Sequence, residues 1–293
     1  MSETITLFVS IKKLLKKVPY LVAAKKSTWL FVNRIKWRVF DKRTNRVEYS
    51  SFGPIIINVN DKFISKSIVD DGYWAIQDID LIRKLIDVQL NETKVLTFYD
   101  VGANIGTHSL ALSKIFKSRI KIRAFEAQRP IYNMLCGTMA LNSANNVFCH
   151  LNAVSSKGGE FINIELPDYT KPNNFGGFEL MPPRHSDNES MSRGDAVESV
   201  ETLCLDSFNE PVQFIKMDIE GMEDKALLGC SNIIEKFRPI CFIEILKTDS
   251  DFVIKFFEDR NYTFLKRRGD ALFIPLEYES QVRSIEKFHE YFG

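Results

Sequence analysis

One stretch of the 293-residue chain limits its fold more than any other. Between Val95 and Gly106 an apolar run ends in the acid Asp100, continues into a loop with Gly102, and leads into apolar residues at helical spacing. This pattern predicts a buried parallel strand, a tight loop and the first turn of a helix. Such a loop lies at the carboxyl edge of an open α/β sheet, where nucleotide-like ligands bind, and its glycines let backbone and ligand approach closely.

The segments around this stretch alternate between short apolar runs and helical patterns, which is typical of a parallel sheet with helices packed on it. Strands are expected at residues 120–125, 147–154, 212–217 and 240–246, with a closing hairpin at 262–274. Helices are expected at residues 76–90, 129–141, 226–237 and 252–257. Further upstream, residues 55–59 and 63–68 are predicted to be short strands.

Residues 167–197 interrupt this alternation with a sequence rich in Pro, Asn, Gly and Ser. Long loops over a binding edge are usually lids or recognition elements. We therefore expect one domain at 50–293 that carries a lid-like insertion. Asn173, Asn174 and Phe175, at the centre of the insertion, are the expected substrate-binding residues.

The first 49 residues are predicted to form a basic helical arm. Residues 1–46 hold 12 lysines and arginines against two acids, a net charge of +10, whereas the remaining 27 basic and 36 acidic residues give −9. As a helix, residues 7–18 place apolar side chains on one side and four lysines on the other. Two interpretations remain open: a helix that docks on the body with its lysines in solvent, or one that lies on an anionic membrane surface.

Composition narrows the class of protein. The five cysteines are scattered without the spacing of a zinc site, which favours a reducing compartment and a cytoplasmic protein, peripheral to a membrane if the arm binds lipid. The sequence contains no run of about 20 apolar residues, so no membrane-spanning helix is predicted. Nucleic acid is not expected as a partner, because no aromatic platform accompanies the basic charge.

An acid at the end of the second predicted strand indicates the kind of ligand. Glu126 follows Gly106 by twenty residues, and a carboxylate there can accept two hydrogen bonds from a ribose diol. The loop Gly-Ala-Asn-Ile-Gly is neither GxGxxG nor a P-loop, so a pyrophosphate ligand is not well supported. Asp100 suits a ligand with an ammonium group. S-adenosylmethionine, which carries an amino acid end and an adenosine end, fits both acids.

Several motifs together resemble the FkbM family of S-adenosylmethionine-dependent methyltransferases. They are Asp100-Val-Gly-Ala-Asn-Ile-Gly-Thr-His, Phe125-Glu126, Thr202-Leu-Cys-Leu-Asp206, Ile215-Lys-Met-Asp-Ile-Glu-Gly-Met-Glu223, Arg238-Pro239 and Glu244. The resemblance covers about residues 95–275, and its most specific part is the Lys-x-Asp-x-Glu-Gly segment. Glu126 is followed by Ala-Gln-Arg-Pro where the family commonly has Pro directly.

The resemblance implies a Rossmann-like α/β fold, a seven-stranded, mostly parallel sheet with helices on both faces and an antiparallel last strand. It also implies O-methylation of a hydroxyl on a sugar, a glycan or a related natural product. The expected contacts of the cofactor S-adenosylmethionine are Asp100, Gly102, Asn104, Gly106, Thr107, Glu126 and Ala153.

The expected catalytic groups follow a later strand. In an extended strand alternate residues face the same way, so Lys216, Asp218 and Glu220 share a side, and Glu244 ends the next strand. Burying ionisable groups at the end of a strand costs free energy unless they form ion pairs or serve a function in the site. Asp218 and Glu220 are candidates for the base or the hydroxyl anchor, with Lys216 orienting them. The same acids also suit a divalent cation, and the sequence leaves both alternatives open.

Two functions of other classes are alternatives to methyl transfer. A nicotinamide-dependent oxidoreductase would share Glu126 and the α/β alternation, but it would require a third glycine in the loop. A binding or scaffold protein would keep the fold and lose site residues, and the intact loop and carboxylates count against it.

The arm generates a prediction that does not depend on the catalytic chemistry. If residues 1–20 lie on an anionic surface, each of the four lysines adds about 1 kcal/mol of attraction, which salt screens. We expect co-sedimentation with anionic liposomes to weaken as ionic strength rises. Partition that does not change with salt, or no binding, would favour the docking helix instead.

Overall fold

The computed structural model describes residues 43–90, 94–179 and 193–292. Thr44–Gly293 form one compact unit. The predicted arm lies outside the described residues up to residue 42, and its last five residues belong to strand β1 (Asn45–Ser50), which pairs with β2 (Gly53–Asn58). Among the described helices, none is long and apolar enough to cross a membrane.

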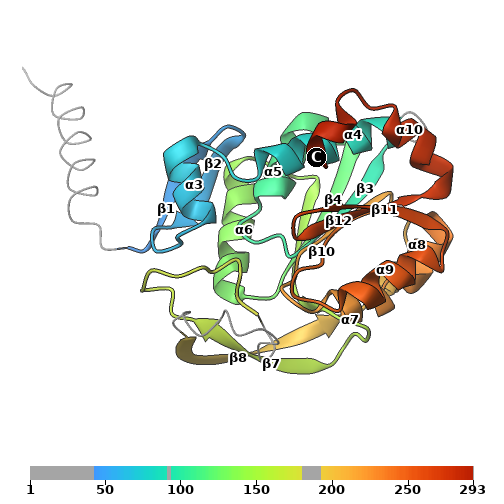
Figure 1. Cartoon of the computed structure of the whole chain (residues 1–293). Coiled ribbons are helices and arrows are strands. Elements are labelled where there is room, and N and C mark those ends of the chain that lie inside the picture. Colours follow the sequence, from blue (N-terminus) through green and yellow to red (C-terminus); the bar gives the residue numbers. More distant parts are fainter. Residues whose placement is uncertain (1–42, 91–93, 180–192, 293) are drawn as a thin grey trace, which may run out of the picture. The chain divides into compact units, whose positions relative to one another are not determined.

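A seven-stranded sheet forms the centre of this unit, in the order β11-β12-β10-β9-β3-β4-β5 (Figure 1). The strands are β3 (Leu96–Val101), β4 (Ile120–Glu126), β5 (Val147–Leu151), β9 (Phe214–Met217), β10 (Ile240–Glu244), β11 (Tyr262–Arg267) and β12 (Asp270–Pro275). The five strands from β10 to β5 are parallel, and β12 runs antiparallel to both of its neighbours. The predicted α/β sheet and its closing hairpin are confirmed.

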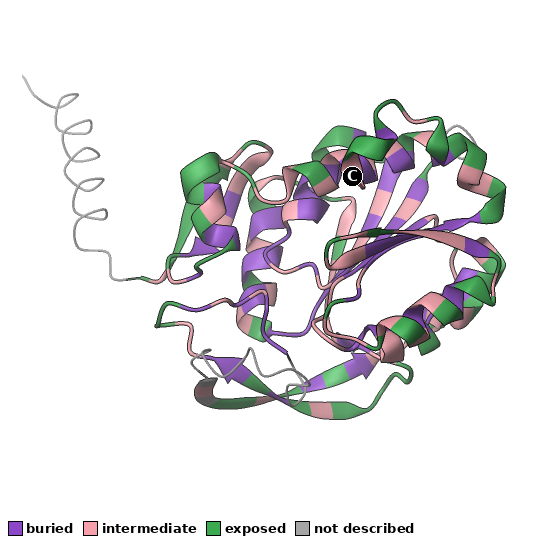
Figure 2. Ribbon diagram, in the orientation of Figure 1, coloured by how far each residue is buried: buried purple, intermediate pink, exposed green. Residues whose placement is uncertain are grey.

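Helices cover both faces of the sheet. One layer contains α4 (Ile76–Gln89), α5 (Thr107–Phe116), α6 (Arg129–Leu141) and α10 (Glu279–Arg283), and the other contains α7 (Glu223–Leu228), α8 (Ser231–Phe237) and α9 (Ser250–Glu258). Neighbouring residues of β3 face opposite layers: Phe98 packs with the α4 side and Tyr99 with the α7–α9 side, and both are fully buried. Figure 2 shows that the strands of the central sheet are mostly buried. This two-sided burial is why β3 carries large apolar or aromatic side chains toward both layers.

A small subdomain lies beside α6. It consists of β1, β2 and the helix α3 (Ile64–Asp71), so the strand predicted at 63–68 is wrong. Asp61 explains the helix, because its carboxylate accepts a hydrogen bond from the backbone N–H of Ser65 at 2.7 Å and satisfies a donor of the first turn. Ile64 and Ile68 bury one face of α3 against β2 and α6.

The predicted insertion begins and ends in strands of a second, three-stranded sheet. This sheet contains β6 (Ala153–Val154), β8 (Arg193–Leu203) and β7 (Phe161–Pro167), in that order. The strand expected at 147–154 is therefore two strands, because the chain leaves the central sheet after Leu151 and β6 pairs with β8 instead. Between β7 and β8 the structure describes residues 168–179, called the lid segment below.

The contact between β3 and β9 generates a stability prediction. A Cβ added to Gly102, at φ +77°, would lie 1.8 Å from the backbone oxygen of Asp218, whereas one added to Gly159, at φ +80°, would meet nothing within 4 Å. Both substitutions to Ala carry the left-handed backbone cost of about 1–2 kcal/mol. We expect Gly102→Ala to lose about 1–3 kcal/mol more than Gly159→Ala in urea unfolding, because backbone must also shift. Equal losses would contradict the close approach of the two strand ends.

Candidate active site

A cavity of about 290 Å³ lies at the carboxyl ends of β3, β4, β9 and β10. Ten of the predicted site residues line it: Gly102, Asn104, Thr107, Glu126, Ala153, Asn174, Lys216, Asp218, Glu220 and Glu244. Four others do not line it: Asp100, Gly106, Asn173 and Phe175. The cavity opens where the chain order of the strands reverses on either side of β3, which is where ligands bind in open α/β sheets.

The glycine loop after β3 folds tightly across the end of β4. Gly102 and Ala103 both donate backbone hydrogen bonds to the carbonyl of Phe125, at 3.0 and 2.9 Å. Three of the five loop residues, Gly102, Asn104 and Gly106, have positive φ angles, and Gly106 then begins α5. Left-handed positions of this kind are the reason the sequence places Gly and Asn here.

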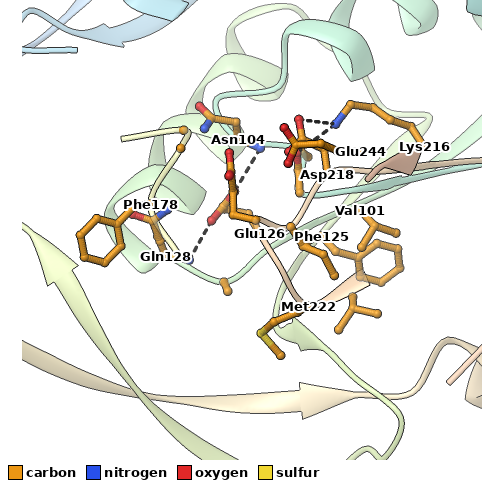
Figure 3. A pocket seen from close by; sticks show the side chains of 18 of the residues that line it. Val101, Asn104, Phe125, Glu126, Gln128, Phe178, Lys216, Asp218, Met222 and Glu244 are labelled. Atoms are coloured by element: carbon orange, nitrogen blue, oxygen red, sulfur yellow. Dashed lines mark hydrogen bonds and ion pairs between the residues drawn. The ribbon is translucent and has the colours of Figure 1, made fainter. Parts of the chain in front are cut away.

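Glu126 ends β4 and faces the glycine loop. Its Oε2 accepts the backbone N–H of Asn104 at 3.1 Å, and its Oε1 accepts that of Gln128 at 2.8 Å (Figure 3). Burial raises the pKa of Glu126 to about 7, although these backbone bonds and Lys216 act in the opposite direction. Each carboxylate oxygen retains capacity for a further hydrogen bond from a ligand hydroxyl.

Asp100 is placed behind the loop and not in the cavity. Its side chain is fully buried, and its Oδ2 accepts the hydroxyl of Ser109 at 2.6 Å. The ammonium of Lys216 lies 3.7 Å from Asp100 and 3.7 Å from Asp218, and donates to the carbonyl of Gly102 at 3.3 Å. In this structure Asp100 therefore anchors the loop through Ser109 and Lys216 and is not in a position to contact a ligand in the cavity directly.

Lys216 carries a positive charge at neutral pH. Burial alone would lower its pKa, but the carboxylates of Asp218 and Asp100 outweigh burial and raise it. A charged ammonium cannot accept a proton, so Lys216 in this state is not suited to act as a base.

Three carboxylates gather at the ends of β9 and β10. One oxygen of each of Asp218, Glu220 and Glu244 lies within 4.8 Å of the others. Burial and then the Asp218 charge raise the pKa of Glu220 to about 8 and that of Glu244 to about 9. The Glu244 Oε2 atom is buried and has no hydrogen-bond partner within the described part of the chain. Clustered carboxylates with pKa values raised in this way are typical of sites that transfer protons or bind cations.

The loop that carries these acids is held in an unusual conformation. Glu220 has φ +56° and Gly221 φ +99°. The buried carboxylate of Glu223 accepts the backbone N–H groups of Ile219 at 2.9 Å and Gly221 at 3.0 Å. Left-handed backbone at a non-glycine residue costs about 1–2 kcal/mol, and Glu223 provides two charge-assisted bonds that offset it.

Of the three predicted lid residues, Asn174 lines the cavity and Asn173 and Phe175 do not. Asn174, Gly176, Gly177 and Phe178 line the cavity. Phe175 is instead buried with β2, α3 and α6, and packs its ring 4.8 Å from that of Tyr169. The core therefore contains Phe175, whereas Phe178 lines the cavity.

The structure adds residues that the sequence did not single out. Gln128, two positions beyond Glu126, donates from Nε2 to the carbonyl of Phe175 at 3.2 Å and accepts the hydroxyl of Tyr169 at 2.7 Å. His108 lines the cavity in neutral form, because burial and then Lys216 lower its pKa to about 4. Lys247, three positions after Glu244, also reaches the cavity, and its place at the end of a parallel strand was the available signal.

Comparison with known proteins gives a family match over the same region. The model of the methyltransferase FkbM domain matches residues 100–264, more than half of the chain. No curated protein matches the chain.

Among solved structures, the chain is similar to the methyltransferase FkbM from Methylobacillus flagellatus KT, with 19% identity and a TM-score of 0.43 over 61% of this chain and 43% of that one. The chain thus spans less than half the length of that protein. It is also similar to an rRNA methylase from Streptococcus thermophilus (13% identity, TM-score 0.40, 67% of this chain and 92% of that one). The chain is likewise similar to a SAM-dependent methyltransferase from Agrobacterium tumefaciens, with 8% identity and a TM-score of 0.40 over 79% of this chain and 69% of that one.

The carboxylate cluster generates a pH prediction. Because the pKa of Glu244 is raised to about 9 in the folded protein, the folded state holds a proton that the unfolded state releases between pH 5 and 9. Stability is therefore expected to fall as pH rises through this window. Glu244→Gln cannot ionise, so its melting temperature should fall less steeply with pH than that of the parent protein.

The exposed Glu201, substituted in the same way, serves as the control and should leave the slope unchanged. Thermal unfolding by circular dichroism from pH 5 to pH 9 measures both variants. Parallel curves for the parent and Glu244→Gln would show that Glu244 does not titrate as described.

Proposed function

The chain belongs to the FkbM methyltransferase family, and from this premise we propose that it transfers a methyl group from S-adenosylmethionine to a hydroxyl group of a sugar, glycan or related natural product. The observation that carries the proposal is the single cavity that joins two kinds of group. Glu126 and the glycine loop lie on one side of it, and Asp218, Glu220 and Glu244 lie on the other.

The first side of the cavity suits the cofactor. The buried Glu126 carboxylate offers acceptor capacity to a ribose diol, and Asn104 and Gly102 present the backbone of the loop. Val101, Phe125 and Met222 gather near Glu126 (Figure 3) and provide the apolar surface that a flat adenine ring requires. Ala153 and Val154 line the same cavity. When bound, S-adenosylmethionine supplies a methyl group activated by its positively charged sulfur.

The second side suits the acceptor hydroxyl. The Asp218 backbone lies against the glycine loop at Gly102, which places this residue next to the cofactor side. Asp218 is placed to accept a hydrogen bond from the acceptor hydroxyl. It would take the hydroxyl proton when the methyl group passes from sulfur to oxygen and S-adenosylhomocysteine is left. Lys216, 3.7 Å away, holds Asp218 in place. Glu220 and Glu244, whose pKa values lie near 8 and 9, complete the polar wall.

A sugar acceptor is supported by the rest of the lining. Trp74 and Phe63 border the same cavity and provide aromatic surface for the apolar face of a sugar ring. Asn174 from the lid segment adds an amide that bonds hydroxyl groups. We propose the described lid residues as acceptor contacts, with Asn174 and Phe178 in the cavity and Asn173 and Phe175 shaping the segment.

A divalent cation at the three carboxylates is the alternative use of this wall. Carboxylate oxygens are the ligands that Mg²⁺ prefers, and their spacing permits a shared ion. Two ammonium groups already neutralise part of this cluster, since Lys247 pairs with Glu220 and Lys216 with Asp218. We therefore favour proton transfer without a metal.

The cofactor assignment predicts the effect of removing Glu126. Glu126→Ala should weaken binding of S-adenosylmethionine about 10- to 100-fold, because hydrogen bonds to a charged group contribute about 1.5–3 kcal/mol. Glu160→Ala, an exposed acid outside the cavity, is the control. Isothermal titration calorimetry measures both variants. Unchanged affinity would remove Glu126 from the site, and binding of NAD in place of S-adenosylmethionine would favour the oxidoreductase.

The chemical assignment predicts the effect of changing Asp218. Asp218→Asn keeps the shape and loses the basicity, so kcat should fall about 10²- to 10⁴-fold while the cofactor Kd changes little. Methyl transfer from labelled S-adenosylmethionine to extracted glycans measures turnover, with Asp251→Asn on the exposed side of α9 as control.

Two further outcomes of that assay separate the alternatives. Loss of activity with a chelator and its return with Mg²⁺ would support the cation. Turnover of Asp218→Asn at the parent rate would contradict both the base and the cation, and no product from the parent protein would favour a binding or scaffold role.

A further inference from the structure

Lys247 lies beyond the end of β10 and contacts two parts of the cavity at once. Its ammonium donates to the carbonyl of Gly177 in the lid segment at 3.1 Å. The same nitrogen forms an ion pair with the carboxylate of Glu220. Both side chains of the pair are mostly buried, with 20% and 13% of their surface exposed, so solvent screens the contact weakly.

The lid segment is fixed by other groups on its opposite side. Asn173 exchanges backbone hydrogen bonds with Asn60 and Lys62, both at 2.9 Å. Gln128 donates to the carbonyl of Phe175 at 3.2 Å. These contacts attach the lid segment to the β2–α3 turn and, through Gln128, to the residues after β4. The residues after β4 lie on the cofactor side of the cavity. Lys247 attaches the lid segment to β10 and to Glu220, which is the acceptor side.

Glu220 depends on Lys247 for a counter-charge. The acids that face Glu220 are Asp218 on its own loop, Glu223 at the start of α7 and Glu244 at the end of β10. Each of them disfavours a charge on Glu220, whereas Lys247 favours it. The backbone of Lys247 also packs on the loop, since a Cβ at Gly221 would lie 3.2 Å from the Lys247 carbonyl oxygen.

We propose that Lys247 is a positioning residue that couples the lid segment to the carboxylates: by holding Gly177 and Glu220 together, it closes residues 174–178 over the cavity and orients Glu220 for the acceptor. The inference rests on the proposed function for its purpose. The coupling itself is a property of the folded chain and is tested without turnover.

Hydrogen–deuterium exchange with saturating S-adenosylhomocysteine tests the lid. Lys247→Met removes the ammonium and keeps the length, and backbone amides 174–178 are expected to exchange at least 10-fold faster. Lys247→Arg keeps the charge and should stay within about threefold of the parent protein. Lys157→Met, an exposed lysine outside the cavity, is the control. Unchanged exchange at 174–178 in Lys247→Met would overturn the proposal.

Carboxyl NMR of glutamate-labelled protein tests the other half of the coupling. The Glu220 resonance is assigned by its loss in Glu220→Gln. Its titration midpoint should move upward by about one pH unit in Lys247→Met, since the lysine stabilises the charged form, and stay near the parent value in Lys247→Arg. An unchanged midpoint would overturn the role at Glu220. Failure of methyl transfer in the parent protein would leave both measurements intact, so the two proposals fail separately.

Discussion

The buried ammonium of Lys216 is the interaction on which the site depends. It lies between Asp100 beneath the glycine loop and Asp218 after β9, and donates to the carbonyl of Gly102. Asp100 and Lys216 are directly paired across β3 and β9, so the contact follows from sheet register. An isolated charge at this depth would be costly, and the two carboxylates offset that cost only if both strand ends keep their places. The glycine loop and Asp218 are thereby held as one unit.

Carboxylates outnumber the cations around the cavity. Burial raises the pKa of Glu126 to about 7. Burial and then repulsion from Asp218 raise the pKa of Glu220 to about 8 and that of Glu244 to about 9. Such groups reduce the stability of the folded chain as pH rises, because each holds a proton that its unfolded form would release. The acids around the cavity therefore lower the stability of the folded chain at high pH and have pKa values from about 7 to about 9.

Local sequence patterns were sufficient to predict the alternating strands and helices of the central sheet. The apolar run of β3, the left-handed loop positions and the helix after them were readable because each is fixed by a few consecutive residues. Glu126 was identified by its distance from Gly106, and α6 was predicted with its observed bounds. The short segment 63–68 was misread, since the hydrogen bond that the Asp61 carboxylate accepts from Ser65 at the start of α3 outweighs the β-propensity of its isoleucines.

The sequence by itself therefore determined which segments of the central sheet follow one another along the chain, where the glycine loop lies and which acids stand at strand ends. Side-chain periodicity and chain direction fix these features locally. Only the tertiary structure decided where those side chains go. It turned Asp100 inward to Lys216, gave Phe175 to the core and Phe178 to the cavity, and brought Lys247 from β10 to the lid. These contacts join residues 70 to more than 110 positions apart, and their geometry depends on how helices and sheets pack, which no short segment encodes.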